Sequence, residues 1–242
     1  MTSSTEITEN SDVIESITYF DGLGRPKQQI AIKASPEVQD IVTHITYDDY
    51  GRQDKQYLPY KSTLTPGEYK TVDVIDDIQQ YYKDKYTPDF GAISVTEVNA
   101  YSESIFEPSP LNRVLKQAAP GADWKATELD DDYTIKFDWD TNQANEVVYF
   151  KVNFHMDNTE IPILVQDQYY PASELYVTIT KDENWTSNQL HNNDHTIKEY
   201  KDKLGRVILK RTYDQNIPHD TYYVYDDFGN LTYVIPPKVN TA

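Results

Sequence analysis

One short string, x-Asp-x-x-Gly-(Arg/Asn), occurs four times in this chain and constrains the fold more than any other feature. The copies begin at Phe20, Tyr47, Lys201 and Tyr225. A fifth segment, 107–113, keeps the spacing, with Ser109 in the place of Asp and Asn112 in the place of Gly. Four of the eight glycines of the chain occupy the same place in this motif, so the repeat is not accidental.

The motif has the chemistry of a tight turn between two strands. The Asp carboxylate can accept the backbone N–H two residues on, and the Gly three residues after it supplies the positive φ that closes a hairpin. Asn is the usual substitute for Gly at such a position. The residues assigned to these turns are Asp21, Gly24, Arg25, Asp48, Gly51, Arg52, Asn112, Arg113, Asp202, Gly205, Arg206, Asp226, Gly229 and Asn230. Because β-branched and aromatic residues flank the copies, each copy predicts a strand, a turn and a strand.

The interval between the second and fourth copies predicts longer strands. Apolar residues alternate with polar ones over 133–139 and 148–156, and the turn-like stretch 140–145 predicts that these two strands form a long hairpin. A third strand is expected over 175–179. Helical spacing of apolar residues predicts one short α-helix within 73–85. The expected fold is therefore mainly antiparallel β, built from hairpin units with one helix.

Charge and composition exclude several classes of protein. The net charge is −18, with 40 acidic and 22 basic side chains, and the chain has no Cys. A nucleic-acid or anionic membrane partner requires clustered Lys and Arg, so neither is expected. No disulfide, thiolate metal site or Cys nucleophile can exist, and no apolar run reaches the roughly 20 residues of a membrane helix.

The ends of the chain suggest how it is organised. Residues 1–14 form a polar segment without a secretory signal, which predicts a disordered or linker N-terminus. A single β-rich domain is expected over 15–238, followed by a short tail, 239–242, that looks truncated. We expect an internal piece of a longer chain.

Several segments resemble a known bacterial family, the Rhs or YD-repeat proteins. The turns, and above all Tyr225-Asp226-Asp227-Phe228-Gly229-Asn230-Leu231-Thr232, look like YD repeats. The segments 16–26, 57–60, 110–114, 120–124 and 219–225 together resemble the uncharacterised domain that precedes the repeats in many large Rhs-type proteins.

The resemblance implies a structural role. Rhs proteins are large secreted or surface polypeptides whose hairpins spiral into a hollow β-shell, which in polymorphic-toxin members encloses a C-terminal toxin. This chain would be an early section of such a shell, and its partners would be further YD repeats and the toxin or cargo of the same polypeptide. Self-association through the terminal hairpin is the other expected contact. The family's self-cleavage motif contains Asp-Pro, a dipeptide that this chain lacks, and 113–201 holds no YD-like copy.

No motif predicts a catalytic, cofactor or metal site. His191 and His195 could share a metal only on a helix, and the surrounding Ser and Asn residues favour a polar loop. The stretch 138–149 begins like a calcium loop but lacks its Gly and its Glu. The run 130–132 is expected to be a solvated acidic turn. Nucleotide-binding and serine-hydrolase signatures are missing, so a non-enzymatic protein is expected.

Two other functions stay open. The leading alternative is a carbohydrate- or surface-binding adhesin module that uses exposed Tyr and Trp side chains, because the chain contains 21 Tyr and 3 Trp. A glycan-cleaving enzyme is a remote alternative, since paired carboxylates among 40 acids provide no specific signal.

Overall fold

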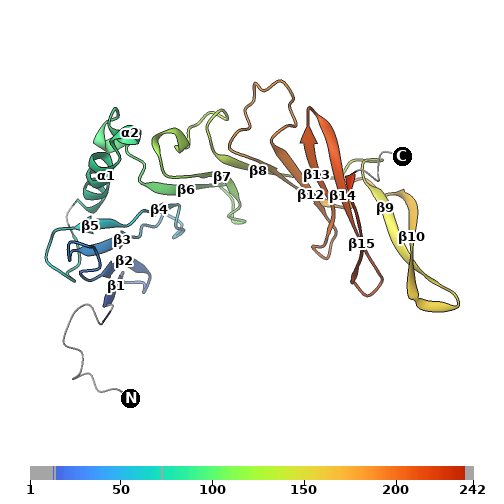
Figure 1. The fold of residues 1–242 in the computed structure, drawn as a ribbon, viewed down its shortest axis with the longest axis horizontal. Helices are drawn as coiled ribbons and strands as arrows, with labels where there is room; N and C mark the ends of the chain where they lie inside the picture. Colours follow the sequence, from blue (N-terminus) through green and yellow to red (C-terminus); the bar gives the residue numbers. More distant parts are fainter. Residues whose placement is uncertain (1–12, 14, 72, 238–242) are drawn as a thin grey trace, which may run out of the picture. The chain divides into compact units, whose positions relative to one another are not determined.

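The computed structural model describes residues 13, 15–71 and 73–237, and it divides the chain into two compact units, Met1–Ala126 and Thr127–Ala242. Every strand pair in these described ranges is antiparallel, as the turn motifs predict. The mainly β fold class is confirmed (Figure 1). The single domain expected over 15–238 stays a prediction. Except for Val13, the predicted N-terminal segment 1–14 lies outside the described residues, and so does the tail 239–242.

The first unit contains a four-stranded sheet and a second, three-stranded group. The sheet has the order β1 (Ser16–Phe20), β2 (Pro26–Ala31), β3 (Asp40–His44) and β5 (Tyr60–Ser62). The second group has the order β4 (Lys55–Tyr57), β6 (Tyr101–Phe106) and β7 (Val114–Ala118). Short 3-10 turns, η2 (Val95–Glu97) and η3 (Ala122–Trp124), and the four-residue helix α2 (Thr87–Phe90) complete the unit.

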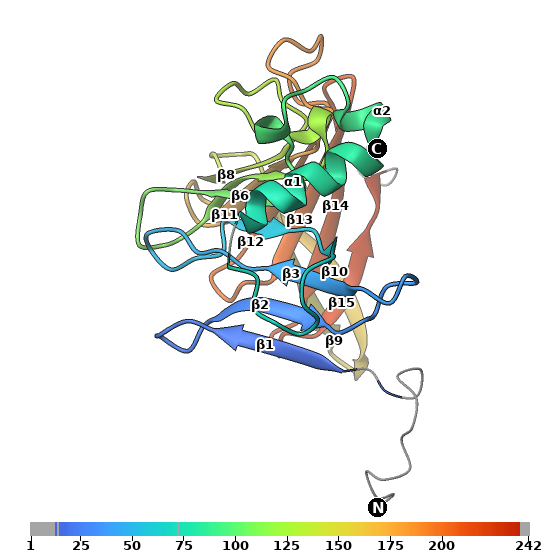
Figure 2. The same cartoon turned by 90° about the vertical axis from the view of Figure 1, so that its left-hand side faces the viewer.

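The predicted helix is α1 (Val74–Lys85), and it buries one face against the four-stranded sheet. Val74, Ile78 and Tyr82 recur four residues apart and so lie on one side of the helix, where they pack with Ile30 and Val42 of the sheet. Figure 2 shows α1 in green beside the blue strands. The helix prediction is confirmed, and this apolar contact is the core of the first unit.

The second turn motif does not form the regular hairpin that its flanks predict. β3 pairs with β2 and β5, while β4 pairs with β6, and the isolated bridge Ile45–Gln56 links the two sides beyond the turn itself. After the turn, the Asp54 carbonyl accepts a hydrogen bond from the Ser104 N–H at 2.8 Å. The chain therefore changes sheets at this turn, because the strand after it finds its partner in β6.

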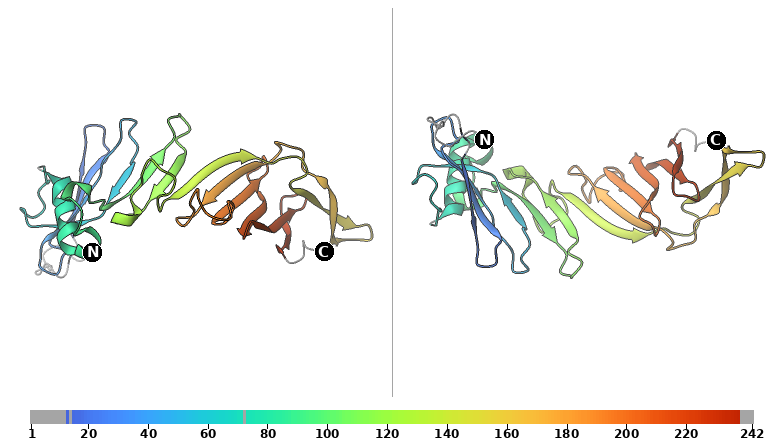
Figure 3. Two further views of the ribbon diagram at one scale, coloured as in Figure 1. Left: turned by 90° about the horizontal axis from the view of Figure 1, so that it is seen from above. Right: turned by 90° about the horizontal axis from the view of Figure 1, so that it is seen from below.

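The second unit is a twisted antiparallel sheet with a separate hairpin packed on it. The order is β8 (Ile135–Thr141), β11 (Tyr176–Lys181), β12 (Thr196–Lys201), β13 (Val207–Asp214), β14 (Ile217–Tyr225) and β15 (Leu231–Ile235). β9 (Val148–His155) and β10 (Asn158–Tyr169) form the two-stranded hairpin, drawn in yellow in Figure 3. Phe150 of this hairpin meets Tyr222 of β14 edge to face, and both belong to the core of the unit.

The predicted long hairpin between 133–139 and 148–156 is wrong. β8 pairs with β11, and β9 pairs with β10 instead. Asn142, fully buried just after β8, explains the difference: its side chain accepts from the Leu175 N–H at 2.8 Å and donates to the Pro171 carbonyl at 2.8 Å. These bonds hold the end of β8 against the start of β11, so the β9–β10 hairpin is inserted between two paired strands.

Candidate functional site

Four of the repeated turns share one set of hydrogen bonds. In the first turn, the Asp21 Oδ1 accepts hydrogen bonds from the N–H groups of Leu23 and Arg25, each at 2.9 Å. The Gly24 N–H donates to the Asp21 carbonyl at 3.0 Å, and the Asp21 N–H donates to the Arg25 carbonyl at 2.8 Å. The turns at Asp48, Asp202 and Asp226 repeat all four bonds. The predicted role of Asp is confirmed.

The predicted left-handed positions are also confirmed. Gly24, Gly51, Gly205 and Gly229 have φ between 77° and 85°, and Asn112 has φ 52°. L-residues with a larger side chain rarely adopt this region, which is why Gly recurs at this place.

The arginine of the motif has a role that sequence analysis missed. In the first turn, the Arg25 Nε donates to the Asp21 Oδ2 at 2.8 Å, and Arg52 and Arg206 do the same with Asp48 and Asp202 at 2.7 Å. One carboxylate thus closes the turn with one oxygen and binds the guanidinium with the other. In the turn that begins at Asp226, the fifth in chain order, the Asn230 side-chain amide donates to the Asp226 Oδ2 at 3.0 Å in place of a guanidinium.

In the turn at 107–113, the third in chain order, two residues together make the contacts that Asp makes in the other turns. The Ser109 Oγ accepts the Leu111 N–H at 3.2 Å, as expected for the residue that replaces Asp. The Glu107 carboxylate, which sequence analysis did not assign, binds the Arg113 guanidinium at 2.7 and 2.9 Å and accepts from the Ser109 hydroxyl at 2.7 Å. The hydrogen bonds from Arg113 and Ser109 lower the pKa of Glu107 to about 2.

Consecutive turns are joined by their arginines. The Arg25 guanidinium lies 4.2 Å from the ring centroid of Tyr47, the residue just before the acid of the second turn. Arg52 lies 4.4 Å from Phe106, just before Glu107, and Arg206 lies 4.9 Å from Tyr225, just before Asp226. We call this series of contacts, made by Arg25, Arg52 and Arg206 within their own units, the turn ladder. Each contact is a cation–π interaction between one turn and the next turn of the same unit.

The Gly or Asn of the receiving turn is part of the same contact. A Cβ added to Gly51 would lie 3.1 Å from the Arg25 Nη1, and one added to Gly229 would lie 3.7 Å from the Arg206 Nη1. In the third turn, Asn112 accepts a hydrogen bond from the Arg52 Nη1 at 2.8 Å. The aromatic residue before the acid of each receiving turn, Tyr47, Phe106 or Tyr225, was the sequence signal that could have revealed the ladder.

Hydrogen bonds in the turns favour the ionised acids. The backbone hydrogen bond from Arg25 is the largest cause that lowers the pKa of Asp21. Burial acts to raise the pKa of Asp48, but hydrogen bonds from Arg52 and Tyr50 outweigh it and the pKa is lowered. The Asn230 side chain is the largest cause that lowers the pKa of Asp226. The pKa values of Asp21, Asp48 and Asp226 therefore all lie below the ordinary value of an aspartate.

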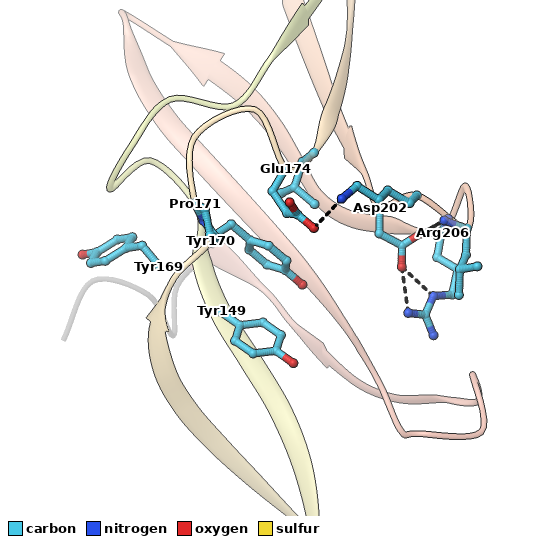
Figure 4. Close-up of a pocket in the computed structure, with 10 residues that line it drawn as sticks. Tyr149, Tyr169, Tyr170, Pro171, Glu174, Asp202 and Arg206 are labelled. Atoms are coloured by element: carbon cyan, nitrogen blue, oxygen red, sulfur yellow. Dashed lines mark hydrogen bonds and ion pairs between the residues drawn. The ribbon is translucent and has the colours of Figure 1, made fainter.

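A cavity of about 490 Å³ in the second unit lies beside the turn that begins at Asp202, the fourth in chain order. Tyr149 and Tyr170 form one side of it, and Asp202 and Arg206 of the turn lie opposite, as Figure 4 shows. The ion pair between Glu174 and the Lys203 Nζ, at 3.0 Å, also lines the cavity. The cavity therefore combines aromatic side chains of the hairpin with charged side chains of the turn.

The acidic and histidine candidates are placed in structural roles. His191 and His195 lie in a loop rather than on a helix, and the His195 Nδ1 is 3.2 Å from the Asp182 Oδ2. Asp138 pairs with Lys181 at 2.8 Å. Within the described part of the chain, no group of three or more His, Asp or Glu residues is arranged to hold a metal ion.

The expected solvated turn at 130–132 is wrong for its last residue. Asp132 is buried, where it accepts the Thr134 hydroxyl at 2.6 Å and pairs with the Lys136 Nζ at 2.9 Å. Burial acts to raise the pKa of Asp132, but these partners outweigh it and the pKa is strongly lowered. Charge pairing lets the carboxylate leave water, so Asp132 is a structural anchor of the loop.

Comparison with known proteins gives a family match. A family model described as Domain of unknown function (DUF6443) matches residues 1–137, more than half of the 242 residues. No curated protein matches the chain. None of the helices in the described ranges has the length and apolar character that a membrane crossing requires.

Proposed function

The chain belongs to the family described as Domain of unknown function (DUF6443), and from that premise we propose that it is a non-catalytic structural section of a large secreted or surface protein of the Rhs or YD-repeat type. In that role its hairpins form part of a β-shell, and its partners are further hairpins of the same polypeptide and the cargo they enclose. The antiparallel fold and the turn geometry fit this role. The role itself is carried over by analogy, from the resemblance of the sequence motifs.

The turn ladder is the observation that carries the proposal. An enzyme needs groups that converge on a substrate, whereas here the repeated Asp and Arg residues bind one another within each turn. The guanidinium groups of Arg25, Arg52 and Arg206 also lie over an aromatic ring of the next turn. Elements that stabilise their neighbours in sequence order are typical of repeat architectures.

The last hairpin offers a surface where such an architecture would continue. β15 has β14 as its one strand neighbour among the described strands, so its other edge presents unpaired backbone groups. Leu231 and Val234 on this strand are 51% and 52% exposed. No Lys or Arg lies between Arg211 and Lys238, so the basic residues that commonly protect an open edge are missing.

Hydrogen exchange tests the proposal. We expect the amides of 221–235 to exchange faster in the present chain than in a version extended by several Asp-x-x-Gly-Arg hairpins, because a further strand would protect the edge. The amides of β12 and β13 lie inside the sheet and serve as the internal control. Val234→Lys in the extended version should restore fast exchange at β15 alone.

Two outcomes separate the proposal from its alternatives. A short chain that self-associates with protected β15 amides would support an edge that accepts another strand. Equally slow exchange of 221–235 in both versions, with the short chain strictly monomeric, would show that the fold is complete without further hairpins and would overturn the shell-section proposal.

A further inference from the structure

The cavity beside the fourth turn has one aromatic wall. Tyr149 comes from β9, and Tyr170 follows the last residue of β10, so the paired hairpin strands place both rings. Their centroids are 4.9 Å apart with the ring planes at 66°, and the Tyr170 N–H donates to the Val147 carbonyl at 2.9 Å. Figure 4 shows the two hydroxyl ends directed toward the side of Asp202 and Arg206, whereas Tyr169 points away. The aromatic wall is therefore held in place before any ligand arrives.

The two phenol groups are available as hydrogen-bonding groups. Among the described residues, neither the Tyr149 nor the Tyr170 hydroxyl makes a hydrogen bond. Burial raises the pKa of Tyr170 above its ordinary value, so this hydroxyl keeps its proton and can donate. Tyr149 is 39% exposed and lines the cavity, so part of its ring is accessible to a ligand.

The opposite wall presents charges that are already neutralised in pairs. Glu174 binds Lys203 at 3.0 Å, and Asp202 binds Arg206 at 2.7 Å. A cationic ligand would meet Lys203 and Arg206, and an anionic ligand would meet the two carboxylates in a chain of net charge −18. The wall therefore favours a neutral ligand that can both donate and accept hydrogen bonds.

We propose that this cavity binds a neutral saccharide. A sugar ring has an apolar face of C–H groups that can lie on the accessible part of the Tyr149 ring, and hydroxyl groups that can donate to the carboxylates and accept from the Lys203 and Arg206 side chains. The volume of about 490 Å³ lies in the range of small-molecule sites. Binding would place the sugar next to the fourth turn without using any catalytic group. The inference is independent of the shell-section proposal.

The test uses the whole chain and a panel of neutral sugars: glucose, galactose, mannose, N-acetylglucosamine, cellobiose and lactose. Saturation-transfer NMR and calorimetry should detect at least one of them, with a Kd on the order of 1 mM for a ligand of this size. Tyr149→Ala should weaken binding about tenfold by removing the platform. Tyr149→Phe, which keeps the ring, should retain most of the affinity.

Two further variants make the result decisive. Glu174→Gln removes one acceptor charge from the lining of the cavity and should also weaken binding. Tyr176→Ala removes a tyrosine of the same unit that is 63% exposed and lies outside the cavity, so it should leave binding unchanged. Circular dichroism of each variant checks the fold. Absence of binding for every sugar, or binding that Tyr149→Ala and Glu174→Gln leave unchanged in folded protein, would overturn the proposal.

Discussion

Arg52 holds its guanidinium 4.4 Å from the ring centroid of Phe106, a residue that lies one turn motif further along the chain. The same guanidinium binds Asp48 of its own turn at 2.7 Å and donates to the Asn112 side chain of the next turn at 2.8 Å. One side chain therefore connects two turns, and the stability of each turn should depend on the other.

The contact between Arg52 and Phe106 should appear as a coupling energy. Arg52→Lys removes the planar group that both stacks and donates, and Phe106→Leu removes the aromatic face but keeps an apolar side chain. A double-mutant cycle by urea unfolding should give a coupling of about 0.5–1 kcal/mol. Strict additivity of the two changes would contradict the ladder contact.

Gly51 and Gly24 should respond differently to the same substitution. Both have φ near 80°, so Ala at either place should cost about 1–2 kcal/mol of unfolding free energy. A Cβ at Gly51 also meets the Arg25 Nη1 at 3.1 Å, whereas nothing among the described atoms lies within 4 Å of one at Gly24. Urea unfolding should therefore show the larger loss for Gly51→Ala.

Gly51→Asn should be the best tolerated change at this position. Asn adopts the left-handed region more readily than other residues with a Cβ. Asn112 shows at the equivalent place that an Asn side chain can accept a hydrogen bond from the preceding arginine. A loss as large as that of Gly51→Val would contradict this interpretation of the turn.

Acid should weaken the third turn. The pKa of Glu107 is lowered from 4.5 to about 2 by its hydrogen bonds from Arg113 and Ser109. Because the folded state has the lower pKa, its contribution to stability is complete above about pH 4.5 and is lost as the pH falls toward 2. The urea midpoint should fall over this window, and less steeply in Glu107→Gln. Asp49→Asn, at an exposed turn position, is the control and should keep the slope of the unchanged chain.

The second unit should depend on a half-buried ionic network. Arg211 and Asp220 face each other across β13 and β14, and their side chains are joined at 2.6 and 2.8 Å. The Glu146 Oε1 accepts from the Tyr200 hydroxyl at 2.6 Å and from the Arg211 Nη1 at 3.3 Å.

The two partners Arg211 and Asp220 should be energetically coupled. Arg211→Leu removes the cation that Asp220 and Glu146 share. We expect this change to lower the free energy of unfolding by about 3 kcal/mol or more. The double variant Arg211→Leu/Asp220→Leu should lose less than the sum of the single changes. Thermal unfolding of the three variants checks this, and additive losses would contradict a coupled network.

The amino-acid sequence by itself determined the turns. The hydrogen bonds that Asp21 accepts from the N–H groups of Leu23 and Arg25 span at most four residues, and the positive φ of Gly24 is a property of one residue. The helix at Val74–Lys85 was predictable for the same reason, because a helix repeats one local geometry. Such features require nothing from distant parts of the chain.

Only the tertiary structure decided which strands pair and what the turns contact. Alternation over 133–139 and 148–156 identifies strands but not their partners, and the buried Asn142 joined β8 to the chain near Leu175 instead of to β9. The contact of Arg52 with Phe106 and the cavity beside Tyr149 likewise join distant segments. A two-residue period is satisfied by any strand partner that buries the same face, so the choice depends on nonlocal hydrogen bonds and packing that exist only once the chain has folded.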